Sequence, residues 1–202
     1  MFLLATLGLQ VQTKNTDDLR STLDNPAALI QANQMSFDGH ENTGPYNRIQ
    51  SVLNLESNFY SLLNDEYGVA HVPRLPLIGQ PDPVSNSSIY GLGDFSYKAV
   101  FTPRKHGSWI WGIGPWLLFP TGTDEILTTG KFSAGPAVLV MYQNGFMSLG
   151  GFLSQAWSYA GDGSREDVSY IEVNPIVRVH VEEKSSVGFL DTIYLNWKAD
   201  AG

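Results

Sequence analysis

The chain contains no cysteine, few charged residues and no long uninterrupted apolar run. Without thiols it cannot form a disulfide framework, a zinc–thiolate or iron–sulfur site, or a cysteine nucleophile. Charged residues make up 16% of the 202 residues, against about 25% in ordinary soluble domains. Acidic residues outnumber basic ones, 20 to 12. The chain therefore lacks the clustered positive charge of a nucleic-acid binder, and we expect no nucleic-acid partner.

Every apolar run is interrupted before it reaches the roughly 18 residues that a membrane-spanning helix needs. If the chain crosses a membrane, it must do so as a closed β-barrel, because only a closed sheet pairs every backbone polar group in lipid. Aromatic residues reach 12% and glycine accounts for 20 positions. This composition favours a β-rich protein with apolar outer surfaces.

Two regions differ along the chain. Residues 1–45 are predicted to be an N-terminal extension, polar and irregular, with a weak helix over residues 18–31. Residues 1–11 are apolar like the core of a secretory signal but lack a preceding basic residue, so they fit either a clipped signal or a first strand. Residues 46–202 are predicted to form the β-rich domain.

From residue 46 on, apolar and polar side chains alternate, which is the period of a strand whose neighbours point to opposite faces. In residues 94–101, Asp94 and Lys98 oppose an apolar set that includes Phe95 and Tyr97. The clearest run covers residues 168–181. One of its faces carries Ile171, Val173, Val177, Val179 and Val181, and the other carries Glu172, Asn174, Arg178 and His180. Such strands are not buried on both sides.

The connections between these strands alternate in length. Short turns are predicted at residues 64–66, 104–108, 143–145 and 182–186, and longer polar connections at 79–91, 121–130 and 161–167. In an antiparallel meander, alternate connections lie at opposite ends of the sheet. Outer-membrane barrels have short turns at one end and long loops at the other, although lipocalins and sandwiches can share this pattern.

Aromatic residues gather toward the predicted strand ends, where an interfacial girdle would place them. The girdle candidates are Trp109, Trp111, Trp116, Phe119, Phe146, Trp157 and Tyr159. The alternative is that they are core aromatics of a soluble sandwich, which would show the same alternation.

Five stretches keep their order over residues 24–202: QPDP with GLGD (80–94), WGIGPWLLFPTGT (111–123), GKFSAGP (130–136), WSYAGD (157–162) and NWKADAG (196–202). Together they resemble a family of bacterial outer-membrane transporters labelled for the meta-pathway of phenol degradation, whose members also carry the misleading name neuromedin U. The resemblance implies a transmembrane barrel of about twelve strands in the Gram-negative outer membrane. It also implies small apolar or aromatic solutes.

Family members continue for several strands past the motif at residues 196–202 and end on an aromatic-rich strand that barrel-assembly machinery reads. We therefore expect the 202 residues to be a fragment with about eight strands of the larger barrel, and the complete chain to be a partner of that machinery.

The sequence predicts no catalytic residues, no cofactor and no metal, and hence no enzyme. The Gly130-Lys131 pair lacks the remainder of a phosphate-binding loop. The four histidines are scattered without metal-ligand spacing, and no Gly-x-Ser-x-Gly motif occurs.

The polar faces of the strands remain as the candidate site. Charged residues in lipid-crossing strands are tolerated where they face a polar interior. The predicted lumen residues are Asp94, Lys98, Glu172, Asn174, Arg178 and His180. Glu172 and Arg178 are six residues apart on one strand, about 20 Å, so each needs a partner on another strand.

The sequence thus predicts an antiparallel up-and-down transmembrane β-barrel that contacts outer-membrane lipid and passes small solutes. Two alternatives remain open: a soluble β-calyx or sandwich that binds an apolar ligand, and a structural outer-membrane barrel without transport.

Overall fold

The computed structural model describes residues 9–10, 33–43, 48–82, 87–104, 107–182, 185–190 and 192–196. These residues form a single antiparallel β-sheet and no helix, which confirms the predicted all-β antiparallel class. The predicted helix at residues 18–31 lies outside the described residues. The strands are β1 (Leu9–Gln10), β2 (Asn33–Thr43), β3 (Arg48–Ser57), β4 (Phe59–Leu62), β5 (Tyr67–Pro81), β6 (Ser88–Leu92), β7 (Phe95–Pro103), β8 (Trp109–Phe119), β9 (Lys131–Gln143), β10 (Met147–Gly161), β11 (Ser169–Glu182), β12 (Ser185–Leu190) and β13 (Ile193–Asn196).

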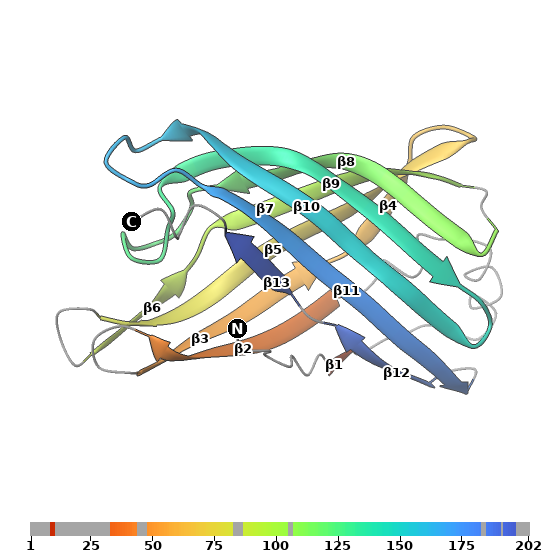
Figure 1. Ribbon diagram of the computed structural model, residues 1–202, viewed down its shortest axis with the longest axis horizontal. Helices are drawn as coiled ribbons and strands as arrows, with labels where there is room; N and C mark the ends of the chain where they lie inside the picture. Colours follow the sequence, from red (N-terminus) through yellow and green to blue (C-terminus); the bar gives the residue numbers. More distant parts are fainter. Residues whose placement is uncertain are drawn as a thin grey trace.

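The sheet follows the order β1-β2-β3-β5-β7-β8-β9-β10-β11-β12, and it curls into a half-barrel with inclined strands (Figure 1). Several labelled segments belong to one long strand. β3 and β4 lie in one continuous register on β5, and β12 and β13 do the same on β11. β6 and β7 both pair with β5, with a register shift of one residue between them. The described sheet is therefore an up-and-down meander of long neighbouring strands.

Strand β2 changes the predicted domain boundary. It lies within residues 1–45, predicted to be an extension, yet it pairs with β3 from Asn33 opposite Ser57 to Thr43 opposite Arg48. Met35 and Phe37 alternate with polar neighbours, and both are exposed on the same side of the sheet. The sheet therefore begins before residue 46. Most residues of β2 are polar, so its short alternation of apolar and polar residues is difficult to recognise in the sequence.

The two ends of the sheet differ as the sequence predicts. The connections β4–β5, β7–β8, β9–β10 and β11–β12 are short and lie at one end, while β5–β6, β8–β9 and β10–β11 connect at the other (Figure 1). The side chain of Asn144 closes the β9–β10 turn by accepting hydrogen bonds from the backbone N–H groups of Phe146 and Met147. The loop predicted over residues 79–91 is shorter than expected, because β5 and β6 pair from Leu77 opposite Leu92 to Pro81 opposite Ser88.

The two faces of the sheet differ in burial. The concave face carries the apolar core, whose buried members are Ala70, Val100, Ile110, Trp116, Leu118, Ala137, Leu139, Met141 and Ala156. The convex face leaves large apolar side chains exposed. They include Phe101, Trp109, Trp111, Ile113, Phe132, Val140, Leu149, Leu153, Trp157, Tyr159, Val177, Ile193 and Leu195.

Glycines on the concave face let the strands approach closely where the sheet curls. A Cβ at Gly114 would lie 1.8 Å from the carbonyl oxygen of Ala99, and one at Gly135 would lie 1.7 Å from that of Gln155. A side chain at either position would collide with backbone, which cannot move aside as a flexible side chain can. Glycine inside a strand commonly marks such a bend.

Candidate functional site

The concave face brings four charged side chains together, which we call the interior charge cluster: Glu56, Arg74, Lys98 and Glu172. They lie on β3, β5, β7 and β11. Arg74 and Glu172 are 98 residues apart in the sequence, and β7, β8, β9 and β10 separate their strands in the sheet. Because the sheet curls, the two side chains meet across its interior instead of along its surface.

Glu172 is the centre of the cluster and is 0% exposed. Arg74 donates two hydrogen bonds to it, from Nη1 to Oε2 at 2.8 Å and from Nη2 to Oε1 at 3.0 Å. This two-point geometry matches the planar guanidinium to the planar carboxylate. Lys98 Nζ donates to the same Oε1. One carboxylate therefore holds two cations from two other strands.

The remaining polar atoms of the cluster also have partners. Arg74 Nε lies 3.4 Å from Glu56 Oε2, and Arg74 Nη1 also donates to the hydroxyl of Tyr194 at 3.0 Å. Lys98 Nζ donates to Asn174 Oδ1 at 3.0 Å, and Asn174 Nδ2 in turn donates to Thr192 Oγ1 at 2.9 Å. These bonds connect β3, β5, β7, β11 and β13 through side chains alone. They offset the cost of burying Arg74, Lys98 and Glu172, which would be high for unpaired ions.

Aromatic rings surround the lysine. Its Nζ lies 5.2 Å from the ring centroid of Trp116 and 5.3 Å from that of Phe152, within cation–π distance. Trp116 also packs edge-on against Tyr170, with ring centroids 5.5 Å apart, and Tyr170 packs against Tyr194 in the same manner at 5.6 Å. The interior at this level is therefore lined by rings as well as by paired charges.

Three predicted lumen residues, Lys98, Glu172 and Asn174, lie together in this network. Asp94 does not. It lies just before β7, and its carboxylate accepts hydrogen bonds from the β8–β9 loop: from Gly122 N at 3.1 Å, Thr128 Oγ1 at 2.6 Å, and Thr129 N and Oγ1 at 2.8 and 2.7 Å. Asp94 therefore fastens the loop that the sequence marks as a long polar connection.

The other two candidates lie farther along β11. Arg178 is buried on the concave face, six residues from Glu172, and does not belong to the cluster. His180 also belongs to β11, but its side chain lies outside the described residues. The sequence prediction that Glu172 needs a partner from another strand is confirmed, since Arg74 and Lys98 come from β5 and β7.

The predicted lumen residues include neither Arg74 nor Glu56, although the alternation of residues 48–60 places Glu56 on the polar face of its strand. Arg74 lies between Pro73 and Pro76 in β5, and proline argues against a central strand. The signal that could have found it is its even spacing with Ala70 and Val72, which are buried on the same face. No spacing in the sequence relates Arg74 to Glu172.

The predicted aromatic girdle divides between the two faces. Trp109, Trp111, Trp157 and Tyr159 are exposed on the convex face, and Phe146 is exposed in the β9–β10 turn. Phe119 is partly buried and packs against Phe95 and Phe132. The prediction for Trp116 is wrong. It is 1% exposed and points inward, because it lies an odd number of residues from Trp109 and Trp111 and so projects from the opposite face.

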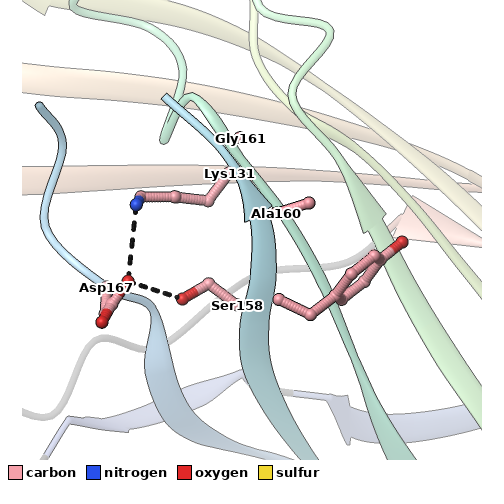
Figure 2. Close-up of a pocket in the computed structure, with 6 residues that line it drawn as sticks. Lys131, Ser158, Ala160, Gly161 and Asp167 are labelled. Atoms are coloured by element: carbon pink, nitrogen blue, oxygen red, sulfur yellow. Dashed lines mark hydrogen bonds and ion pairs between the residues drawn. The ribbon is translucent and has the colours of Figure 1, made fainter. Parts of the chain in front are cut away.

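A small polar hollow lies at the long-loop end, lined by Lys131, Ser158, Tyr159, Ala160, Gly161 and Asp167 (Figure 2). Asp167 Oδ1 lies 3.4 Å from Lys131 Nζ and accepts a hydrogen bond from Ser158 Oγ at 3.2 Å. Register irregularity between Ser158 and Ala160 opens the strands here. The hollow holds one ion pair, whereas the interior charge cluster joins four charged side chains from four strands, so the hollow is the less distinctive site.

Comparison of the chain with protein-family models, with curated proteins and with solved structures gives no match. The part of the chain that the structure describes contains no helix long and apolar enough to span a membrane. The case for a function therefore depends on the two faces of the sheet and on the interior charge cluster.

Proposed function

We propose that this sheet belongs to a transmembrane β-barrel of a Gram-negative outer membrane, and that the barrel passes small solutes through its interior. One observation carries the proposal: the convex face exposes large apolar side chains, while the concave face holds the charged ones. A water-soluble protein keeps its charged residues outside and covers its large apolar residues. Lipid around the sheet would account for the exposed apolar side chains, while the paired charges lie in the interior beside the apolar core.

The extent of the apolar surface supports a lipid environment. Exposed apolar side chains occur on β8, β9, β10, β11 and β13, which are neighbours in the sheet. Soluble monomers rarely expose a contiguous apolar patch larger than a few hundred Å². Trp111 is 51% exposed and Leu153 is 53% exposed. In a bilayer, acyl chains would cover both at no cost in hydration.

The asymmetric ends of the sheet support the same orientation as in known outer-membrane barrels, with short turns in the periplasm and long loops outside. The β8–β9 loop, fastened by Asp94, and the β10–β11 loop would then lie at the outer mouth. They are also connected to each other, because Arg165 Nη2 donates to the carbonyl oxygen of Glu125 at 2.7 Å.

The proposed solutes are small and weakly polar or aromatic, as the resemblance to the outer-membrane transporter family implies. The rings of Trp116, Phe152 and Tyr170 beside the cluster are compatible with such solutes. The family resemblance also implies a complete barrel of about twelve strands, intermediate between small filled barrels and wide porins.

A structural barrel without transport is the second candidate. The contact between Arg74 and Glu172 favours it, because this pair crosses the interior and occupies space that a solute would need. A soluble calyx is less well supported, because a calyx presents a polar exterior to water, whereas the convex face exposes large apolar side chains.

Cysteine scanning along β10 tests the membrane part of the proposal, since the chain has no native cysteine. In the complete protein reconstituted into vesicles, a lipid-soluble thiol reagent should label cysteines at Leu149 and Leu153 and spare those at Ser148 and Ser154. Equal labelling of both faces would contradict a barrel in lipid.

The transport part needs a separate measurement. Planar bilayers that contain the complete protein should show small but reproducible conductance, and a deletion strain should take up an aromatic carbon source more slowly. A lipid-embedded barrel with neither property would favour the structural candidate.

A further inference from the structure

The interior charge cluster is electrically balanced. Arg74 and Lys98 supply two positive charges, and Glu56 and Glu172 supply two negative ones. Both oxygens of Glu172 accept hydrogen bonds from cations, and the lysine is additionally held by Asn174 and two rings. The cluster therefore presents no unpaired charge of either sign at the level where it crosses the interior.

Two uncharged donors lie beside the cluster. Trp116 lies directly opposite Lys98 in the β7–β8 pair, and Ser154 lies directly opposite Glu172 in the β10–β11 pair. Both side chains are 1% exposed. Among the residues that the structure describes, neither Trp116 Nε1 nor Ser154 Oγ has a hydrogen-bond partner. A buried donor without a partner costs about 1–3 kcal/mol, so an acceptor that reaches either atom would gain a bond.

We propose that the interior of the sheet, at the level of the interior charge cluster, admits small neutral solutes that carry a hydrogen-bond acceptor, such as a hydroxyl or carbonyl oxygen. At this level the interior does not discriminate between ions by the sign of their charge. The proposal rests on the transport function proposed above and specifies its solutes. Glu172 is central to this specificity, because its carboxylate contacts both cations and, together with Glu56, balances their charge.

The physical basis is the difference between fixed charge and neutral donors in a narrow passage. A ring of uncompensated charge selects ions of the opposite sign, whereas a balanced cluster provides no such preference. An ion that enters a narrow interior must lose hydration, and a balanced cluster does not replace it. A neutral solute loses less hydration and can bond to Trp116 Nε1 or Ser154 Oγ.

The first measurement compares two solutes of similar size with the complete protein. Vesicles that contain it should admit neutral arabinose faster than the anion arabonate, as followed by osmotic swelling. In planar bilayers under a potassium chloride gradient, the reversal potential should indicate nearly equal permeability to potassium and chloride.

Two variants should unbalance the cluster in opposite directions. Glu172→Gln leaves one net positive charge and should favour chloride over potassium by about threefold or more, while Lys98→Met leaves one net negative charge and should favour potassium to a similar degree. The double variant restores balance and should return the permeability ratio toward one. Opposite shifts from two neighbouring residues would not follow from a general loosening of the barrel.

Two matched variants test the neutral donors. Trp116→Phe removes the indole N–H and keeps an aromatic ring, and Ser154→Ala removes the hydroxyl. Each should slow arabinose entry by about twofold or more, the worth of a lost neutral hydrogen bond, and leave the reversal potential unchanged.

The outcomes separate the two proposals. A wild-type protein that conducts with strong preference for one ion sign, or Glu172→Gln and Lys98→Met variants whose permeability ratios do not shift apart, would overturn this inference and leave transport intact. Arabinose entry unaffected by both donor variants would also count against it. A protein that passes neither ions nor arabinose and does not support uptake of an aromatic carbon source would overturn transport itself.

Discussion

On β10, the outward side chains Leu149, Leu153 and Trp157 are 45%, 53% and 49% exposed, whereas the inward side chains Ser148 and Ser154 are 2% and 1% exposed. The same strand therefore exposes these large apolar residues and buries two serines, beside the buried Ala156. This is the reverse of the pattern by which water-soluble proteins gain stability. The comparison is the basis of the proposal that lipid covers the convex face.

The strongest test of this comparison is Glu172→Gln, which removes the anion that holds Arg74 and Lys98. The free energy of unfolding should fall by about 3–5 kcal/mol, because two buried cations lose their main partner. Urea unfolding of the complete protein in lipid vesicles, followed by tryptophan fluorescence, measures the loss.

Asp65→Asn is the matched control for this variant. The side chain of Asp65 is fully exposed in the β4–β5 turn, 3.7 Å from Arg104. Its change should stay within about 0.5 kcal/mol. A loss at Glu172 no larger than that of the control would show that the interior charge cluster does not stabilise the fold.

The convex face is tested by Leu153→Arg. If this face contacts the bilayer midplane, the guanidinium should reduce stability in lipid by about 2–4 kcal/mol. Tyr159→Arg, on the same face near the end of β10, should cost about 0–1 kcal/mol, because it would lie near the interface. The same unfolding measurement applies. Equal and small costs at the two positions would indicate that water, and not lipid, covers this face.

The curl that separates the two faces is tested by Gly135→Ala. The new methyl group would lie 1.7 Å from the carbonyl oxygen of Gln155, so backbone must shift, and stability should fall by about 1–3 kcal/mol. Gly145→Ala in the β9–β10 turn is the control, since nothing lies within 4 Å of its added Cβ. Similar stabilities for the two variants would contradict the tight bend.

The smallest expected effect lies outside both faces, in the β10–β11 loop. Asp162 Oδ1 accepts hydrogen bonds from the backbone N–H and the hydroxyl of Ser164 at 2.8 and 2.7 Å, and these bonds lower the pKa of Asp162. Because the pKa is lower in the folded state, the bonds stabilise the loop above the unfolded pKa. This contribution is lost as the pH falls through the folded pKa.

Ser164→Ala should move the pKa of Asp162 back toward its ordinary value, as followed by the carboxyl carbon shift in an NMR titration. Ser158→Ala, which removes a donor to Asp167 instead, should leave the titration of Asp162 unchanged. A Ser164→Ala curve identical to that of the wild type would mean that the hydroxyl hydrogen bond does not form in solution.

Much of the fold follows from local patterns. The alternation in residues 168–181 predicts that Glu172, Asn174 and Arg178 share one side of β11, and the structure places Glu172 and Arg178 among its buried polar residues. The tight turns at residues 64–66 and 143–145 are predicted by the same reading and are closed by Asn64 and Asn144. The sequence does not predict strand β2, because its alternation of apolar and polar residues is short and most of its residues are polar.

The candidate site was predictable only in part. Lys98 and Glu172 could be assigned to polar faces, but their meeting could not be derived from spacing. The two prolines near Arg74 argue against a central strand at that position. Proximity to a strand end predicts that Trp116 belongs to the girdle, whereas its odd spacing from Trp109 and Trp111 places it on the opposite face.

Sequence alone settles which side chains share a face, since the direction of a side chain in a strand alternates with period 2 whatever the rest of the chain does. Which of the faces is concave, and which residues meet across it, depends on how far the sheet curls. That curl depends on the close backbone contacts at Gly114 and Gly135 and on the continuous pairing of neighbouring strands in the sheet. Only then does a carboxylate on β11 reach an arginine 98 residues away on β5, because the distance between them is set by the curl of the sheet and not by either strand.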